Sequence, residues 1–174
     1  MTTWVGLLRA VNVGGRNSAP MARVRAAVAS TGATDVRTYV QSGNVVFSSS
    51  LRSEASVITA VEAALAAELG FAVAVVARSA SAMASVAAGN PLLGAGRNPG
   101  RLAVIFLAAE PTLATGIQSV DGEEYALVGR ELYLHAPNGL GRSKLTAVLS
   151  ERRLGVTATT RSWRTVTTLA AMAR

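Results

Sequence analysis

Residue types that build reactive and metal-binding sites are scarce in this chain of 174 residues. It contains no cysteine, which excludes disulfides, thiolate nucleophiles, zinc ribbons and iron–sulfur clusters. Its one histidine, His135, excludes a multi-histidine metal site within one chain. We therefore predict that the protein holds neither a metal ion nor another cofactor, and we interpret His135 as structural.

Long apolar runs are also absent. Charged residues, Pro or Gly interrupt every apolar run well before the roughly 18 residues that a membrane span needs. The N-terminus lacks the basic segment and long apolar stretch of a signal peptide. Half of the residues are nevertheless hydrophobic and 16% are charged, which suits one compact domain or two small packed halves. These features predict a cytoplasmic protein with no membrane partner.

Positive charge is concentrated near the end of the chain. The formal net charge is +7, and residues 137–174 carry +6 of it, from one acidic residue and seven basic ones: Arg142, Lys144, Arg152, Arg153, Arg161, Arg164 and Arg174. A basic segment beside a nearly neutral body indicates an anionic partner, such as phosphate, a nucleotide or nucleic acid. A solvated helix face with a basic tail explains the same charge without a partner.

Hydrophobic periodicity divides the first half of the chain into six elements. Four apolar segments predict strands, and two stretches with helical spacing begin at Pro20 and Ser53 and end before Gly32 and Gly70. The predicted strands are 3–10, 36–40, 45–48 and 71–77. The order β-α-β-β-α-β is that of the ferredoxin-like plan.

The second half repeats this order after a helix at 79–88 and a Gly/Pro-rich loop at 89–100. The further elements expected are strands at 101–108, 124–128, 131–135 and 156–159 and helices at 111–118, 143–154 and 163–172. We predict an α+β fold of two ferredoxin-like subdomains packed together, with an extra C-terminal helix. The expected parts are residues 1–78, a helix and linker over 79–99, and residues 100–174.

Three loop segments carry most of the candidate chemistry. The first, residues 9–17, lies between a strand and a helix, and its candidate residues are Arg9, Asn12, Gly14, Gly15, Arg16 and Asn17. Glycines allow the backbone to approach a ligand, and amides at a helix start can bind an oxyanion. The alternative is a strand–helix turn that needs positive φ angles.

The second loop, residues 137–145, also leads from a strand into a helix. Ser143 is a natural helix cap, but Arg142 and Lys144 put two cations at a helix start, which is already positive and prefers acidic residues. Such a conflict often marks a functional site, so we predict that Gly139, Gly141 and these three residues bind an anion. Lys144 is the only lysine beside sixteen arginines, which suggests that this position needs an ammonium group.

The third segment, residues 159–165, combines hydroxyls, guanidiniums and an indole. Arg161 could contact phosphate and Trp163 could stack on a base. Equally, Ser162 could cap the last helix while Trp163 fills the core.

Taken together, the loops resemble a known family. The matching segments are LRAVNVGGRN (8–17), PM (20–21), TYVQSGNVVF (38–47), NPL (90–92), GRSKL (141–145) and TTRSW (159–163). They are similar, in the same order, to those of the bacterial domain-of-unknown-function 1697 family, which usually has Asn where this chain has Ser162. The resemblance implies an α+β fold of two ferredoxin-like halves and gives no activity. It also implies that Arg142 and Lys144 belong to a motif.

Three functions remain open from the sequence. The first is an anion-binding module for phosphate, a nucleotide or nucleic acid, which predicts that the three loops converge. The second is an enzyme acting on a phosphorylated or carboxylated small molecule, with Lys144 as charge stabiliser and Asp35, Glu123 or Glu151 brought in by folding. The third is a structural or protein-interaction protein, in which self-association would join sheet edges.

Overall fold

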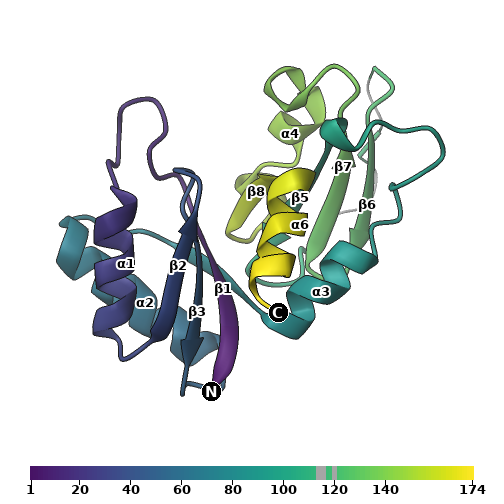
Figure 1. Ribbon diagram of the computed structural model, residues 1–174. Helices are drawn as coiled ribbons and strands as arrows, with labels where there is room; N and C mark the ends of the chain where they lie inside the picture. Colours follow the sequence, from purple (N-terminus) through teal and green to yellow (C-terminus); the bar gives the residue numbers. More distant parts are fainter. Residues whose placement is uncertain (113–116, 119–120) are drawn as a thin grey trace. The chain divides into compact units, whose positions relative to one another are not determined.

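A computed structural model describes residues 1–112, 117–118 and 121–174. The chain forms two compact units: unit 1 comprises Met1–Ser85 and Leu169–Arg174, and unit 2 comprises Val86–Thr168. Each unit contains a four-stranded antiparallel sheet with helices, so the predicted α+β class is confirmed (Figure 1). None of the described helices is long and apolar enough to cross a membrane.

Unit 1 has the strand order β2-β3-β1-β4. Its elements are β1 (Thr2–Leu8), α1 (Met21–Ser30), β2 (Thr34–Tyr39), β3 (Asn44–Ser49), α2 (Glu54–Leu69) and β4 (Val75–Ser79), with α3 (Ala80–Ala88) following. Both α1 and α2 cover one face of the sheet, where the core includes Trp4, Phe47, Val61 and Leu65 (Figure 1). The period-two alternation of the strands therefore directs Trp4 and Phe47 toward the helices.

Helix α2 has the ends that its sequence predicts. The Ser53 hydroxyl accepts a hydrogen bond from the Ser56 amide at 3.1 Å, and Gly70 ends the helix in the left-handed conformation with φ +83°. A serine cap satisfies an otherwise unpaired amide, and glycine adopts positive φ without steric cost.

Strand β4 begins later than predicted, at Val75 instead of residue 71. Its partner β1 ends at Leu8, which pairs with Val75, and the last bond beyond it runs from the Arg9 amide to the Ala74 carbonyl. Residues 71–74 are apolar enough for a strand, but β1 ends before it could pair with them. Hydrophobic periodicity therefore cannot predict where β4 begins, because that limit depends on the length of the neighbouring strand.

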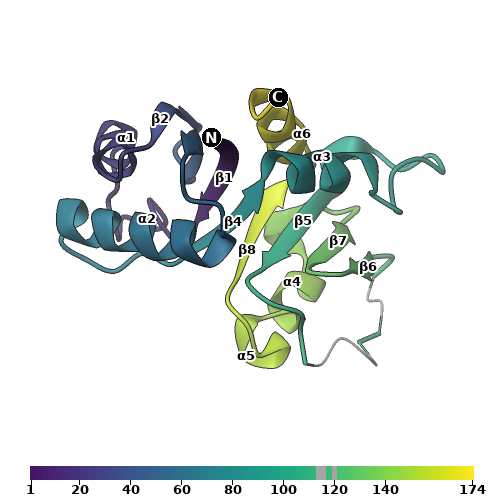
Figure 2. The ribbon, with the colours of Figure 1, turned by 90° about the horizontal axis from the view of Figure 1, so that it is seen from below.

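Unit 2 has the strand order β6-β7-β5-β8. Its described elements are η1 (Pro99–Arg101), β5 (Leu102–Leu107), β6 (Glu124–Val128), β7 (Glu131–His135), η2 (Leu140–Arg142), α4 (Lys144–Val148), α5 (Glu151–Leu154), β8 (Ala158–Ser162) and α6 (Trp163–Met172). The last residues of α6 group with unit 1. A core of Ile105, Leu132, Leu134 and Leu145 joins the sheet to α4, which lies against it with α5 (Figure 2).

Two predictions for unit 2 were wrong in detail. The helix expected over 143–154 is two short helices, because the first ends at Val148 and the second begins at Glu151, with Leu149 and Ser150 as caps between them. The last strand runs over Ala158–Ser162, later than the predicted 156–159, because its pairing with β5 extends from Leu107 to Ala103. Of the helix predicted at 111–118, residues 113–116 lie outside the described residues.

Candidate functional site

The register of unit 2 brings two of the predicted loops to one end of its sheet. Strand β5 is antiparallel to both β7 and β8, and its first residues pair with their last: Leu102 with His135, and Ala103 with Ser162. The loop after β7, which leads to Lys144, therefore leaves the sheet at the same end as the start of α6. The second and third sequence segments share this end, whereas residues 9–17 belong to unit 1.

A ladder of backbone hydrogen bonds fixes the loop after β7. The Ala136 amide donates to the Arg101 carbonyl at 2.9 Å, the Gly139 amide to the Ala136 carbonyl at 2.9 Å, and the Arg142 amide to the Gly139 carbonyl at 3.1 Å. A Cβ on Gly139 would lie 2.8 Å from Nη1 of Arg101. Glycine at this position therefore lets the Arg101 guanidinium lie against the loop backbone, close to the segment that carries Arg142.

The start of helix α4 already holds an anion, the carboxylate of Glu123. This side chain accepts hydrogen bonds from the Ser143 hydroxyl at 2.7 Å and from the Lys144 and Leu145 amides at 3.0 Å each. Glu123 is only 2% exposed. The cations at this helix start are accommodated because a buried acid from twenty residues earlier supplies the negative charge that such a position favours.

Lys144 has a carboxylate partner of its own. Its Nζ lies 2.7 Å from Oδ2 of Asp121, and both side chains are more than half exposed. The hydrogen bond and charge of Asp121 raise the pKa of the Lys144 ammonium. Lys144 therefore stays protonated at neutral pH, which suits a charge stabiliser and not a general base.

A second charged cluster flanks β6 and β7 at the same end of the sheet. The Arg97 guanidinium donates two hydrogen bonds to Glu124, at 2.6 and 3.0 Å. This contact lowers the pKa of Glu124 and raises the pKa of Arg97. His135 Nδ1 lies 3.5 Å from Glu124 Oε2 and makes no hydrogen bond to the described residues. The cluster is neutralised within itself when His135 is neutral.

Two cations at this end have no such neutralising partner. Arg101 and Arg142 are exposed, and within residues 1–112, 117–118 and 121–174 neither forms an ion pair. An exposed guanidinium without a carboxylate keeps its five donors for solvent or a ligand.

The third segment is largely interior. Arg161 lies in β8, is 7% exposed, and donates to the Thr159 hydroxyl at 2.6 Å and the Thr160 carbonyl at 2.9 Å. Burial lowers the pKa of Arg161 to about 10, so it remains charged at neutral pH. Trp163 is 6% exposed and its indole belongs to the interior of the fold. These two side chains support the end of the sheet from within and offer no stacking surface.

In unit 1, the loop 9–17 is braced by the side chain of Asn12. Its amide donates to the Ala19 carbonyl at 2.9 Å and the Gln41 carbonyl at 2.8 Å, while its oxygen accepts from the Ala19 amide at 2.8 Å. Asn17 donates to the Ala10 carbonyl at 3.2 Å. Both asparagines have positive φ, near +55° and +50°. The amides predicted to shape an anion pocket therefore hold the loop to the hairpin at 40–43 and to the start of α1.

The cations of this loop are displayed on a tight turn. Val13 and Arg16 form an isolated antiparallel bridge across Gly14 and Gly15, which have φ of +59° and +72°. Two successive positive φ values are those of a type I′ turn, which glycine favours. Arg9 and Arg16 are exposed, and Val13 is 65% exposed. In Figure 1 the loop between β1 and α1 projects past the start of α1.

Several residues of the unit 2 end were not among the sequence candidates. The sequence predicts Arg101 and Glu124 only as the first residues of strands, and it does not single out Arg97 or Asp121. It offers Glu123 only as one of three acids that folding could bring to Lys144. Glu123 and Ser143 are twenty residues apart, so no local sequence pattern reveals their contact. Only the register of the strands could have shown that they meet. Among the described residues, no group of three His, Cys, Asp or Glu side chains could hold a metal ion.

The chain is similar to known proteins in sequence and in fold. Residues 1–133 match the family described as "Protein of unknown function (DUF1697)". The structure of the conserved bacterial protein SP0830 from Streptococcus pneumoniae is similar with a TM-score of 0.71 and 20% sequence identity, and the match covers 99% of each chain. At this identity the similarity establishes a shared fold only. No curated protein matches the chain in sequence.

Proposed function

Because the chain belongs to the DUF1697 family of proteins of unknown function, we propose a function from its own geometry: it is an anion-binding module whose ligand carries phosphate. Inorganic phosphate, a nucleotide and a nucleic acid backbone share the chemistry that guanidinium groups recognise. The family match confirms the resemblance seen in the motifs. Two of those motifs, 141–145 and 159–163, lie beyond the matched residues, and the first of them contributes to the proposed site.

We propose the end of the unit 2 sheet as the binding surface. The observation that carries the proposal is the pair Arg101 and Arg142, both exposed and free of ion pairs within the described residues. Arg101 directly precedes β5 and Arg142 lies in the loop after β7, and the hydrogen bond from the Ala136 amide to the Arg101 carbonyl joins the two segments. Gly139 lets the Arg101 guanidinium lie against the loop, and Gly141 is exposed with open space where a Cβ would be. Lys144 adds a third cation, which Asp121 orients through a 2.7 Å contact.

Glu123 determines what kind of contact the ligand makes. Its carboxylate already occupies the amides at the start of α4 and the Ser143 hydroxyl. A phosphate would therefore be held by side-chain guanidinium and ammonium groups above the loop. In this proposal Arg161 and Trp163 support the surface from within. The loop 9–17, with Arg9 and Arg16, is a second basic surface, in unit 1.

The architecture proposed for this function is a pair of ferredoxin-like subdomains, over residues 1–78 and 100–174, joined by 79–99. Each sheet has its first and third strands in the centre and its second and fourth at the edges, which supports the proposal. We propose a cytoplasmic location because nucleotides and nucleic acids are found there.

A second candidate function is favoured by one observation, the carboxylate beside Lys144. An enzyme acting on a phosphorylated or carboxylated small molecule needs a fixed cation to stabilise developing negative charge. The raised pKa of Lys144 suits that task. An enzyme must convert its substrate into a product, whereas a binding module need only bind its ligand.

A thermal-shift panel at low salt tests the binding proposal, with inorganic phosphate, ATP, and short single-stranded RNA and DNA as probes. A probe at 100 times its dissociation constant should stabilise the fold by about 2.7 kcal/mol. The shift should be lost in Arg142→Gln and in Arg101→Gln. Arg52→Gln, which removes an exposed arginine of unit 1, is the matched control and should keep it.

Equal shifts in all three variants would mean that the anion binds elsewhere. No shift with any probe, from a folded protein, would reject the module. Release of phosphate from ATP that is lost in Lys144→Ala but unaffected by Arg52→Gln would favour the enzyme.

A further inference from the structure

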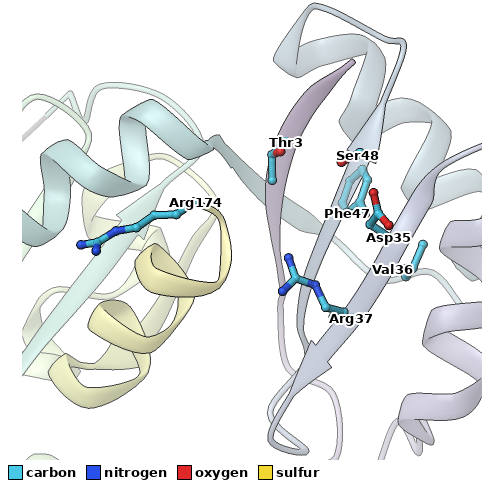
Figure 3. A pocket seen from close by; sticks show the side chains of 7 residues that line it. All are labelled: Thr3, Asp35, Val36, Arg37, Phe47, Ser48 and Arg174. Carbon is cyan, nitrogen blue, oxygen red and sulfur yellow. The ribbon is translucent and has the colours of Figure 1, made fainter.

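A pocket of about 540 Å³ lies in unit 1, and no residue of the proposed anion surface lines it. Its polar lining comes from Thr3, Asp35, Arg37, Ser48 and Arg174, with Val36 and Phe47 completing it (Figure 3). Ligand pockets commonly have volumes of roughly 300–1,000 Å³. The size therefore suits an organic molecule larger than a single ion.

A bulge in the edge strand β2 produces this lining. Thr34 pairs with Ser48 and Arg37 pairs with Val46, so Asp35 and Val36 together stand opposite Phe47. Without the extra residue, the alternation along β2 would place Arg37 on the face that α1 and α2 cover. With it, Arg37 shares the opposite face with Ser48. Bulges of this kind often serve to redirect a side chain at a site.

The pairing of β1 with β3 completes the polar face. Thr3 pairs directly with Ser48, while the neighbouring pair, Trp4 and Phe47, faces the helical core. Thr3 and Ser48 are therefore on the same side of the sheet as Arg37, and both are partly exposed. Two hydroxyls on neighbouring strands can donate to and accept from a ligand's amide groups.

Asp35 and Arg37 lie on the same strand two residues apart but do not neutralise each other. Neither forms an ion pair of 4.0 Å or less with any residue in the described part of the chain. One donor of Arg37 is fixed by the Met172 carbonyl at 2.6 Å. Asp35, one of the two bulge residues, has a left-handed backbone with φ +52°. In Figure 3 the Asp35 carboxylate and the Arg37 guanidinium lie apart and point in different directions from β2.

Opposite charges held apart in one pocket suit a ligand that carries both charges. We propose that this pocket binds a small zwitterion of the size of a short peptide, with its carboxylate on Arg37 and its ammonium group on Asp35. The hydroxyls of Thr3 and Ser48 serve the amide groups between the charges. A ligand with only one charge would leave one pocket group unpaired.

Trialanine with free termini is the probe for a titration of the full ¹⁵N-labelled chain followed by NMR. Binding should produce saturable shifts of the Thr3, Arg37 and Ser48 amides. N-acetyl-trialanine and trialanine amide, which each lack one charge, should bind about tenfold more weakly, because each loses one charge-assisted contact.

Two variants test which pocket residue binds which charged end of the peptide. In Asp35→Asn, trialanine should bind no better than its acetylated form, and Asn tolerates the positive φ of this position. In Arg37→Gln, trialanine should bind no better than its amide. Arg142→Gln, in unit 2, should leave all three affinities unchanged, which keeps this proposal separate from the anion surface. Thermal unfolding of each variant checks that it folds.

The proposal would be overturned by either of two results. The first is the absence of saturable shifts at these amides with millimolar trialanine. The second is an equal affinity for all three peptides in the unaltered protein, because the charges of the pocket would then not select the ligand.

Discussion

The two sheets have corresponding strand orders, yet the loops at their ends are held by different chemistry. In unit 1, the loop after β1 is anchored by a neutral amide, because Asn12 makes three hydrogen bonds to backbone groups. In unit 2, the loop after β7 is anchored by a charge, because the buried Glu123 carboxylate accepts three hydrogen bonds around Ser143. The same topology therefore supports two basic loops by two independent means.

This difference explains why the two loops present their cations differently. The neutral anchor requires left-handed backbone at Ala10, Asn12 and Asn17, and it ends in a projecting glycine turn that carries Arg16. In unit 2 the negative charge of Glu123 offsets the positive charge at the start of α4. Arg142 and Lys144 can therefore lie at this helix start without destabilising it. Substitutions at the two anchors should therefore differ in their effects on stability.

The largest effect is expected for Gly43→Ala, at the hairpin that meets the unit 1 loop. A Cβ would lie 2.7 Å from Leu8 Cβ and 2.7 Å from Val11 Cγ2, at φ +84°. Overpacking and left-handed strain together should cost about 4 kcal/mol. Gly70→Ala has the same φ but open space around it, so it should cost only about 1 kcal/mol. Urea unfolding followed by circular dichroism measures both, and equal costs would contradict the close packing.

Asn12→Gly should cost about 3 kcal/mol, because three hydrogen bonds of about 1 kcal/mol each are lost while glycine keeps the positive φ. Asn17→Gly has a similar φ and loses a single exposed bond, so its cost should be below about 1 kcal/mol. The same unfolding measurement compares them. If the two variants lost equal stability, Asn12 would not be the anchor.

Glu123→Gln should destabilise unit 2 by about 2 kcal/mol, because hydrogen bonds to a charged acceptor become weaker neutral ones. Urea unfolding followed by circular dichroism measures this cost. Asp121→Asn, which removes the exposed partner of Lys144, is the control and should leave stability unchanged. A neutral result for Glu123→Gln would show that the unit 2 loop does not depend on a charged anchor.

The smallest effect concerns pH. Glu124 has its pKa lowered, mainly by the hydrogen bond from Arg97, so its contribution to stability is present above its ordinary pKa of 4.5. That contribution is lost as pH falls from there through the lowered value. Glu124→Gln should therefore cost a small amount of stability near neutral pH and nothing at lower pH. Urea unfolding across the acidic range measures this, and a cost that grew on acidification would contradict the assigned direction.

Local sequence signals predicted the elements that local chemistry determines. The ends of α2 at Ser53 and Gly70, and the strands flanking the Gly129 turn, are confirmed with the predicted residues. Elements whose limits depend on a neighbour were displaced. Strand β4 had to match the end of β1, and β8 had to pair along β5, so its buried Arg161 was mistaken for a loop cation.

The candidate sites were predicted only where the residues lie within one loop. Glycines and cations of the 137–145 segment are visible in the sequence, whereas Glu123, Arg101 and Asp121 reach it through the register of three strands. The pocket around Arg37 depends on one bulge, and a bulge shifts the alternation by a single residue without a distinctive motif.

An NMR titration of the ¹⁵N-labelled protein with inorganic phosphate at low salt tests the proposed anion surface most directly. We predict saturable shifts concentrated at amides 100–102 and 138–144, which are lost in Arg142→Gln and kept in Arg52→Gln. Shifts confined to residues 9–17, or none at any phosphate concentration, would contradict the assignment of anion binding to the end of the unit 2 sheet.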